Sequence, residues 1–172
     1  YRTAPKWSVN GKWAVMYDPI AQVWNKFDGA TGKVVNISDA IGYPMFMESY
    51  DKPAPAPAYG IAGWTADGNV FLYDAYDWWK IDLTGERQPE CLTKGYGRKH
   101  GKSIRKMTSN IDKDVFQKDE KVIVSLWDKD TMDEGVYQLD MKGRLRKLME
   151  GNYVYTIHRF SDNHEYCVWN RQ

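Results

Sequence analysis

The sequence predicts an all-β protein built from repeated four-stranded units. Three observations lead to this expectation. Tryptophan, tyrosine and phenylalanine make up 15% of the 172 residues, and aromatic side chains favour strands and large buried contacts between sheets. Apolar and polar residues alternate over many short runs, as they do in half-buried strands. One pattern also recurs along the chain, which is typical of repeat architectures.

Each copy of the repeat begins with an aromatic residue that leads into a tight turn and then an apolar run. The copies start at Trp7, Trp64, Phe116 and Phe160. The first two contain Asn10-Gly11 and Asp67-Gly68 at the same place in the pattern. Asn-Gly and Asp-Gly between two strand patterns are strong hairpin signals, because these residues tolerate positive φ. We therefore expect both pairs to form equivalent hairpin corners.

The second half of each unit also repeats. It contains an alternating strand, an apolar residue followed by Asp, a loop that ends in Gly, and another short strand, at 23–38, 77–93 and 135–149. In the second unit the four expected strands are Tyr59–Trp64, Asn69–Tyr73, Asp77–Asp82 and Glu90–Leu92. Four-stranded units at intervals of roughly 40 to 55 residues are typical of β-propeller blades.

We expect one incomplete β-propeller domain, with about three four-stranded antiparallel blades and the start of a fourth. The blade-like units are roughly 1–41, 58–93, 113–150 and 153–172, and the connectors are 42–57 and 94–112. The first connector has a proline-rich core that favours a stiff polyproline II segment, and the second is basic. A propeller normally needs about four to eight blades to close. We therefore expect a piece of a longer protein, whose open edges allow self-association.

Charge and composition argue against several functional classes. The formal net charge of +1 gives no overall attraction to nucleic acid or to an anionic membrane. No apolar run approaches the roughly 20 residues of a membrane helix. No cofactor motif is evident, and the histidines and the acidic segment 128–135 lack the spacing of a metal site. Cys91 and Cys167 lie in strand-like contexts, where we expect buried, unpaired thiols rather than a disulfide.

Two groups of residues are candidates for binding a substrate or partner. The first is the basic run with Tyr96, Arg98 and Lys99. A charge run in a loop is usually a solvated face. If a residue of this run touches a substrate, Arg98 is the first choice, since Arg suits a bidentate contact with a carboxylate. The second is Trp78 and Trp79. Adjacent strand residues face opposite ways, so one ring should fill the space between blades; the alternative is a sugar-stacking platform.

Three motifs resemble those of a known family. They are KPAPAP at Lys52–Pro57, YDAYDWW at Tyr73–Trp79 and GYGRK at Gly95–Lys99. Together they resemble the propeller of bacterial prolyl-oligopeptidase-like serine peptidases, and the likeness runs with varying strength from about Trp7 to Trp169. The resemblance implies a propeller placed over an α/β-hydrolase catalytic domain, a peptide substrate, and a secreted or periplasmic location.

The resemblance transfers no catalytic residue to this chain. In that family the nucleophile is a Ser within Gly-x-Ser-x-Gly, followed by Asp and His, and this sequence contains no Gly-x-Ser-x-Gly. We therefore expect the chain alone to be inert. Its expected role is that of a non-catalytic propeller segment that gates peptide access to the catalytic domain of the parent protein. The alternative is a stand-alone propeller recognition module that binds a protein partner or a glycan.

Overall fold

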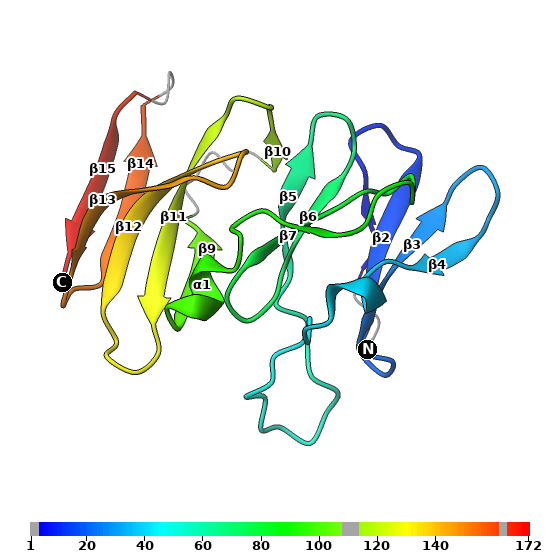
Figure 1. Ribbon diagram of the computed structural model, residues 1–172, viewed down its shortest axis with the longest axis horizontal. Helices are drawn as coiled ribbons and strands as arrows, with labels where there is room; N and C mark the ends of the chain where they lie inside the picture. The colour runs from blue at the N-terminus through cyan, green and yellow to red at the C-terminus, as the bar shows by residue number, and fades with distance from the viewer. Residues whose placement is uncertain (1–3, 108–113, 162–164) are drawn as a thin grey trace.

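Four β-sheets follow one another along the chain in the computed structural model, which describes residues 4–107, 114–161 and 165–172 (Figure 1). Helical structure in these residues is limited to the four-residue α1 (Tyr96–Lys99) and the three-residue 3₁₀ helix η1 (Asp39–Ile41). The protein is therefore all-β, as the aromatic content and the alternation predict. Within the described residues the sheets do not close into a barrel.

The first two sheets keep their strands in chain order. The first sheet consists of β1 (Lys6–Trp7), β2 (Trp13–Asp18), β3 (Val23–Asp28) and β4 (Val34–Asn36). The second contains β5 (Ile61–Thr65), β6 (Val70–Tyr73), β7 (Trp78–Ile81) and β8 (Glu90–Cys91) in chain order, and a short fifth strand at its β5 edge, described below. Neighbours within β1–β4 and within β5–β8 pair antiparallel. The strands β5–β8 lie where the sequence predicts them, with ends that differ by one or two residues.

The third sheet differs from the expected unit 113–150. It consists of β9 (Lys102–Lys106), β11 (Lys121–Asp128), β12 (Glu134–Asp140) and β13 (Leu145–Gly151). β9 comes from the segment expected as a connector, while β10 (Val115–Phe116) pairs parallel to β5 in the second sheet. The three cations of β9 hide its strand pattern, although Ser103 and Ile104 within it are buried. The fourth sheet is the hairpin of β14 (Tyr155–Phe160) and β15 (Cys167–Arg171).

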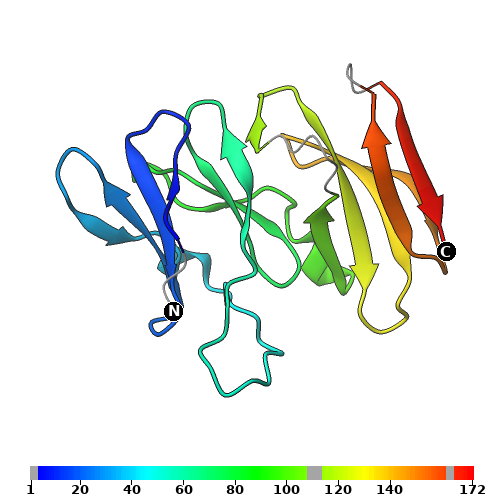
Figure 2. The same cartoon turned by 180° about the vertical axis from the view of Figure 1, so that it is seen from behind.

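The second sheet is covered on both faces. On β6, Phe71 and Tyr73 point into the core shared with the third sheet, while Val70 and Leu72 point into the core shared with the first. This follows from the period of two along a strand. All four side chains are buried, so β6 appears in the sequence as a continuous apolar run. The first three sheets therefore stack face to face, and the fourth follows them in chain order, as Figure 2 shows from behind.

The turns divide the molecule into two ends. The end with the hairpin corners contains Asn10-Gly11 between β1 and β2, and Asp67-Gly68 between β5 and β6. Gly11 and Gly68 have φ values of +68° and +95°, which suit glycine. The two corners touch, because the Asn10 side-chain amide donates to the Asp67 carbonyl over 3.3 Å.

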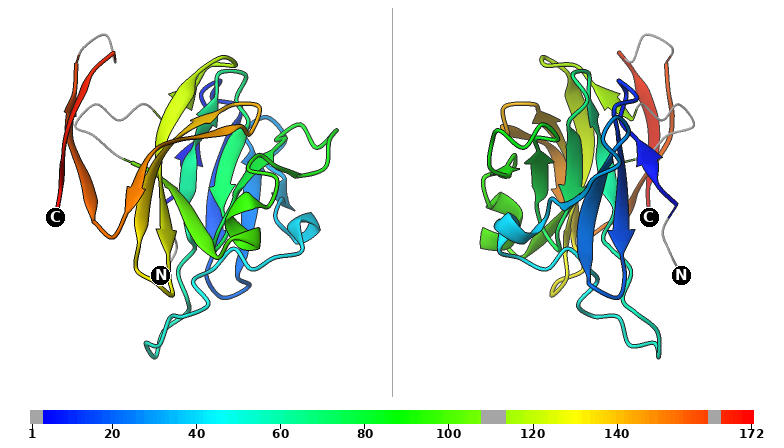
Figure 3. Two further views of the ribbon diagram at one scale, coloured as in Figure 1. Left: turned by 60° about the vertical axis from the view of Figure 1, so that its left-hand side comes forward. Right: turned by 90° about the vertical axis from the view of Figure 1, so that its right-hand side faces the viewer.

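The opposite end contains α1 and the first connector (Figure 3). This connector is not simply extended: it leaves the sheets and doubles back, with Phe46 paired to Ala58 in an antiparallel bridge. The Tyr17 hydroxyl donates to the Ala56 carbonyl over 3.1 Å and holds the proline-rich part of the loop. No helix in the described residues has the length and apolar character needed to cross a membrane.

Candidate functional site

The β6–β7 turn is organised by the carboxylate of Asp74. Its Oδ1 accepts hydrogen bonds from the backbone N–H groups of Tyr76 and Asp77, at 2.7 and 2.6 Å. Asp side chains favour such turns because they bond to the backbone two or three residues ahead. The side chain is completely buried. A buried carboxylate is stable only when both of its oxygens have partners, and Oδ2 of Asp74 accepts the remaining hydrogen bonds.

Oδ2 of Asp74 receives two donors from other parts of the molecule. Arg98 Nη2 lies 2.9 Å away and forms an ion pair, and Trp79 Nε1 lies 3.1 Å away. The four hydrogen bonds to one carboxylate offset the cost of its burial. Asp74 thereby fixes the β6–β7 turn, the Trp79 ring and α1 relative to one another.

Asp77, also buried, binds the start of α1. Its Oδ1 accepts from Thr93 Oγ1 at 2.6 Å and from the Gly97 N–H at 2.9 Å, and its Oδ2 accepts from the Arg98 N–H at 3.0 Å. Backbone N–H groups at a helix start lack partners within the helix, so a carboxylate stabilises them. The helix lies very close to the turn: a Cβ on Gly97 would lie 2.6 Å from the Tyr76 carbonyl oxygen.

The guanidinium of Arg98 is held on several sides. It lies 3.8 Å from the centre of the Tyr43 ring and 5.1 Å from that of the Tyr76 ring. It also forms the ion pair with Asp74. Burial lowers the pKa of Arg98, but the hydrogen bond and the charge of Asp74 outweigh it, so the net shift is upward. Its side chain is 31% exposed. Arg98 therefore joins the first connector to the β6–β7 turn and α1. We call Tyr43, Asp74, Asp77 and Arg98 the clamp.

A second arginine, Arg105 on β9, lies behind the clamp and was not singled out by the sequence patterns. Its guanidinium donates to the carbonyls of Asp74, Ala75 and Ile104, at 2.7, 3.1 and 2.7 Å. The Tyr73 ring centre is 4.6 Å away. Burial lowers the pKa of Arg105 from its ordinary value. No clear signal for this role is visible in the sequence, because the three cations of β9 hide its strand pattern.

The two adjacent tryptophans pack into different cores, as the alternation of a strand predicts. Trp78 is fully buried between the second and third sheets, and its Nε1 donates to the Ile104 carbonyl over 3.1 Å. Trp79 is half-buried on the core shared with the first sheet, 6.0 Å from the Tyr43 ring. Trp78 thus presents no ring face to a ligand. Trp79 donates a hydrogen bond to Asp74 and its ring contacts that of Tyr43. Neither geometry supports a sugar-stacking platform.

The other binding candidates lie on α1. Tyr96 is half-buried against the core between the second and third sheets, and its ring centre is 4.3 Å from that of His100. Lys99 is exposed, and within the described residues its side chain makes no hydrogen bond or ion pair. Of the predicted binding residues, Lys99 is thus the most accessible, while Arg98 and Trp78 serve the structure. The clamp is thus a surface whose side chains are tied together by hydrogen bonds and ring contacts.

The cysteines and acidic residues add no metal site or disulfide in the described part of the chain. Both Cys91 and Cys167 are unpaired thiols, as predicted. The expectation that both are buried is wrong: Cys91 is half-buried and Cys167 is exposed. Cys167 lies on β15, which has a strand neighbour on only one side. Within the described residues, no three His, Cys, Asp or Glu side chains are grouped so that they could hold a metal ion.

Comparisons with known proteins give no further identification. No family model, no curated protein and no solved structure matches this chain. The resemblance described above therefore rests on the motifs themselves, and the function is argued below from these motifs and their geometry.

Proposed function

We propose that the four sheets are blades of a β-propeller: about three four-stranded blades and two strands of a fourth. The support is the order of the strands. Each sheet keeps its strands in chain order, apart from the short β10, and the first three sheets stack face to face through two shared apolar cores. Repeated antiparallel units arranged in this way are the building plan of propellers.

The proposed function is that of a non-catalytic propeller segment of a prolyl-oligopeptidase-like serine peptidase, which limits peptide access to a hydrolase domain. One observation carries this proposal. The motifs YDAYDWW and GYGRK, distant in the sequence, meet in the clamp through Asp74 and Arg98, and the connector with KPAPAP reaches the same clamp through Tyr43. The residues that resemble the family thus form one rigid end of the molecule.

A rigid end is what a gate requires. Binding elements must keep their shape to discriminate substrates by size, and side chains locked by a second layer of hydrogen bonds keep theirs. We place the hydrolase domain and the peptide entrance at this end, against α1 and the first connector. The proposed secreted or periplasmic location follows the family resemblance alone.

The experiment begins with the complete reading frame of the gene. A segment with Gly-x-Ser-x-Gly followed by Asp and His is expected, and a frame without one contradicts the proposal. In the full protein, Arg98→Ala should loosen the gate and raise the cleavage of long peptides relative to short ones. Arg144→Ala is the matched control, because Arg144 is exposed and pairs only locally with Asp140. Equal changes for long and short peptides in the Arg98 variant would count against gating.

A stand-alone recognition module is the second candidate, and the last hairpin favours it. Its exposed apolar side chains include Tyr166, Val168 and Trp169, which are 74%, 65% and 39% exposed. Such an exposed apolar surface suits a protein partner. A reading frame without a hydrolase domain, together with a partner that is lost on Val168→Lys, would select this candidate.

A further inference from the structure

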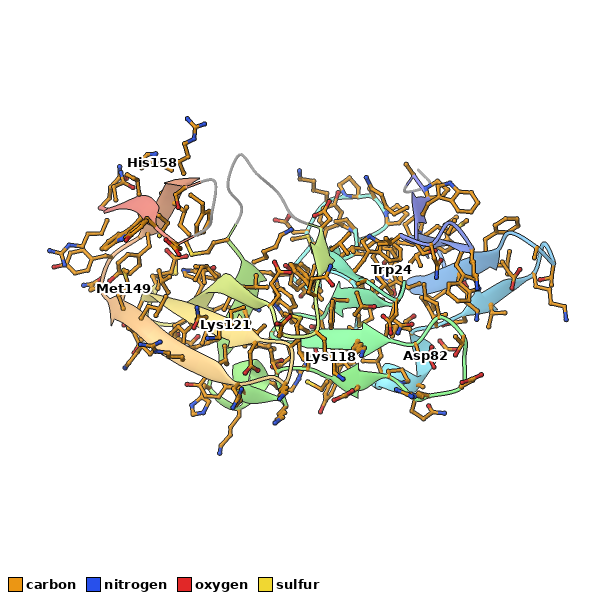
Figure 4. The ribbon with its side chains drawn as sticks, turned by 90° about the horizontal axis from the view of Figure 1, so that it is seen from above. Trp24, Asp82, Lys118, Lys121, Met149 and His158 are labelled. Atoms are coloured by element: carbon orange, nitrogen blue, oxygen red, sulfur yellow. The ribbon has the colours of Figure 1, made fainter. Side chains whose placement is uncertain are left out.

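A pocket lies at the end of the molecule opposite to the clamp. Its volume is about 460 Å³, and it opens between the second and third sheets beside the corner at Asp67. Phe71 and Phe116, with ring centres 6.0 Å apart, form its floor, and Met141 adds an apolar wall. Figure 4 looks down on this end, with Lys118 near the middle. The volume lies within the range of ligand sites, roughly 300 to 1,000 Å³.

Four cations line this pocket. They are Lys80 on β7, Arg87 in the β7–β8 loop, Lys118 in the β10–β11 loop and Lys142 in the β12–β13 corner. The only carboxylate in the lining is that of Asp67, which already accepts a hydrogen bond from the Thr65 hydroxyl. In the described structure, the side chains of the four cations make no hydrogen bond or ion pair.

The pocket is set apart because four cations that lack side-chain partners in the described structure gather around one hollow. Other cations in and beside the same two sheets are paired, namely Arg98 with Asp74, Lys102 with Glu150 and Lys106 with Asp114. Lys99 also lacks a side-chain partner in the described residues, but it does not line this pocket. Like charges around one hollow raise its positive potential and attract an anion. The Arg87 charge contributes to lowering the pKa of Asp82, but Asp82 already accepts hydrogen bonds from Thr84 and the Arg87 backbone.

We propose that this pocket binds an acidic peptide segment, with an apolar or aromatic side chain over the phenylalanine floor and carboxylates toward the cations. Two features select a peptide over a single inorganic anion. The cations come from four separate segments, so they suit charges spread along a ligand. The floor is apolar, which an inorganic anion cannot use. The proposal depends on this pocket alone and stands whether or not a hydrolase domain accompanies the chain.

The test is calorimetric titration of the complete 172-residue chain with the peptide Ac-Glu-Phe-Glu-NH2. Binding is expected, and it should weaken as sodium chloride rises from about 0.05 to 0.5 M, because salt screens exposed charges. Ac-Gln-Phe-Gln-NH2 tests the carboxylates, Ac-Glu-Gly-Glu-NH2 tests the apolar floor, and inorganic phosphate tests a simple anion site. Each should bind more weakly than the first peptide. No binding of the first peptide, or equal binding of the glutamine peptide or of phosphate, overturns the proposal.

Variants locate the binding on the molecule. The double change Lys118→Gln and Lys142→Gln removes two exposed cations and should weaken binding roughly fivefold. The matched control is Lys12→Gln with Lys33→Gln, which removes the same charge from exposed positions on the first sheet. The control should bind as the unchanged chain does. Equal weakening in both pairs would show non-specific attraction and would overturn the pocket as the site. Circular dichroism checks that each variant is folded.

Discussion

Arg98 Nη2 donates a 2.9 Å hydrogen bond to Asp74 Oδ2, although 24 residues separate the two in the sequence. The carboxylate is completely buried and the guanidinium is 31% exposed. The pair is therefore neither a solvated surface contact nor a fully dry one. It fixes the position of α1 against the β6–β7 turn, and it gives Arg98 a structural role at this end of the molecule.

Removal of the Asp74 charge should lower the stability of the protein. Asp74→Asn leaves the Arg98 guanidinium without its counter-charge and weakens the hydrogen bonds to the turn. We expect the free energy of unfolding to fall by about 3 kcal/mol, measured by urea denaturation. Asp130→Asn is the control, since Asp130 is exposed and its side chain makes no hydrogen bond or ion pair in the described structure. A fall in the Asp74 variant no larger than in the control would show that the clamp contributes little.

The close approach of α1 to the turn predicts that Gly97 cannot be replaced. A Cβ at this position would lie 2.6 Å from the Tyr76 carbonyl oxygen and 2.7 Å from that of Lys102. Both atoms belong to the backbone, so the helix itself must shift. Gly97→Ala should destabilise the protein by about 2 kcal/mol, seen as a lower urea midpoint. Lys99→Ala in the same helix should leave the midpoint unchanged; an unchanged midpoint for Gly97→Ala would contradict the packing described here.

Acid should weaken the ion pair between Glu150 on β13 and Lys102 on β9, the two edge strands of the third sheet. Hydrogen bonds from Lys102 and Lys147 lower the pKa of Glu150 from 4.5 to about 2. A carboxyl group with a lowered folded-state pKa stabilises the protein above its unfolded value, and this stability is lost as pH falls from 4.5 toward 2. The urea midpoint should therefore fall over this range.

Glu150→Gln tests the assignment of this acid effect. The variant should be less stable at pH 7 and should lose less stability than the unchanged chain between pH 5 and about 3. Other carboxyl groups, such as Asp28 and Asp128, also have a lowered pKa and remain as the background. If the stability of both proteins falls equally steeply as the pH is lowered, Glu150 is not the responsible group.

Open strand edges predict self-association. Among the described strands β15 has a neighbour only on the β14 side, and Val168 on β15 is 65% exposed. Unpaired edges with apolar side chains are templates for pairing with another chain. We expect the average mass from light scattering to rise with concentration, and Val168→Lys to reduce this rise. A single monomer mass at high concentration would contradict this prediction.

The predictable part of the fold is local. The strands of the second sheet were predicted well because their signals each lie within about ten residues. These signals are the apolar run of β6, the Asp-Gly corner and the aromatic residues of β7. β9 was missed because its three cations resemble a charged loop. Their partners, such as Glu150 for Lys102, lie far away in the sequence.

The candidate site was less predictable for the same reason. The pattern YDAYD does not show that Asp74 and Asp77 are buried, because their compensating donors come from α1 and Thr93. Nor does the basic run show which cations are paired: Arg98 is bound in the clamp and Lys99 is free of side-chain partners in the described structure. Contacts between distant segments decide these roles, and a single sequence does not display them.

The most direct test concerns the end of the molecule with α1 and the first connector, where we propose that the hydrolase domain lies. A photo-crosslinking residue is placed at Lys99 on α1, or at Lys12 beside the opposite corner, in the protein expressed from its complete reading frame. Both side chains are exposed. The account predicts crosslinks into a hydrolase domain from position 99 and none from position 12. Crosslinks from position 12 alone, or a reading frame that encodes no hydrolase domain, would contradict it.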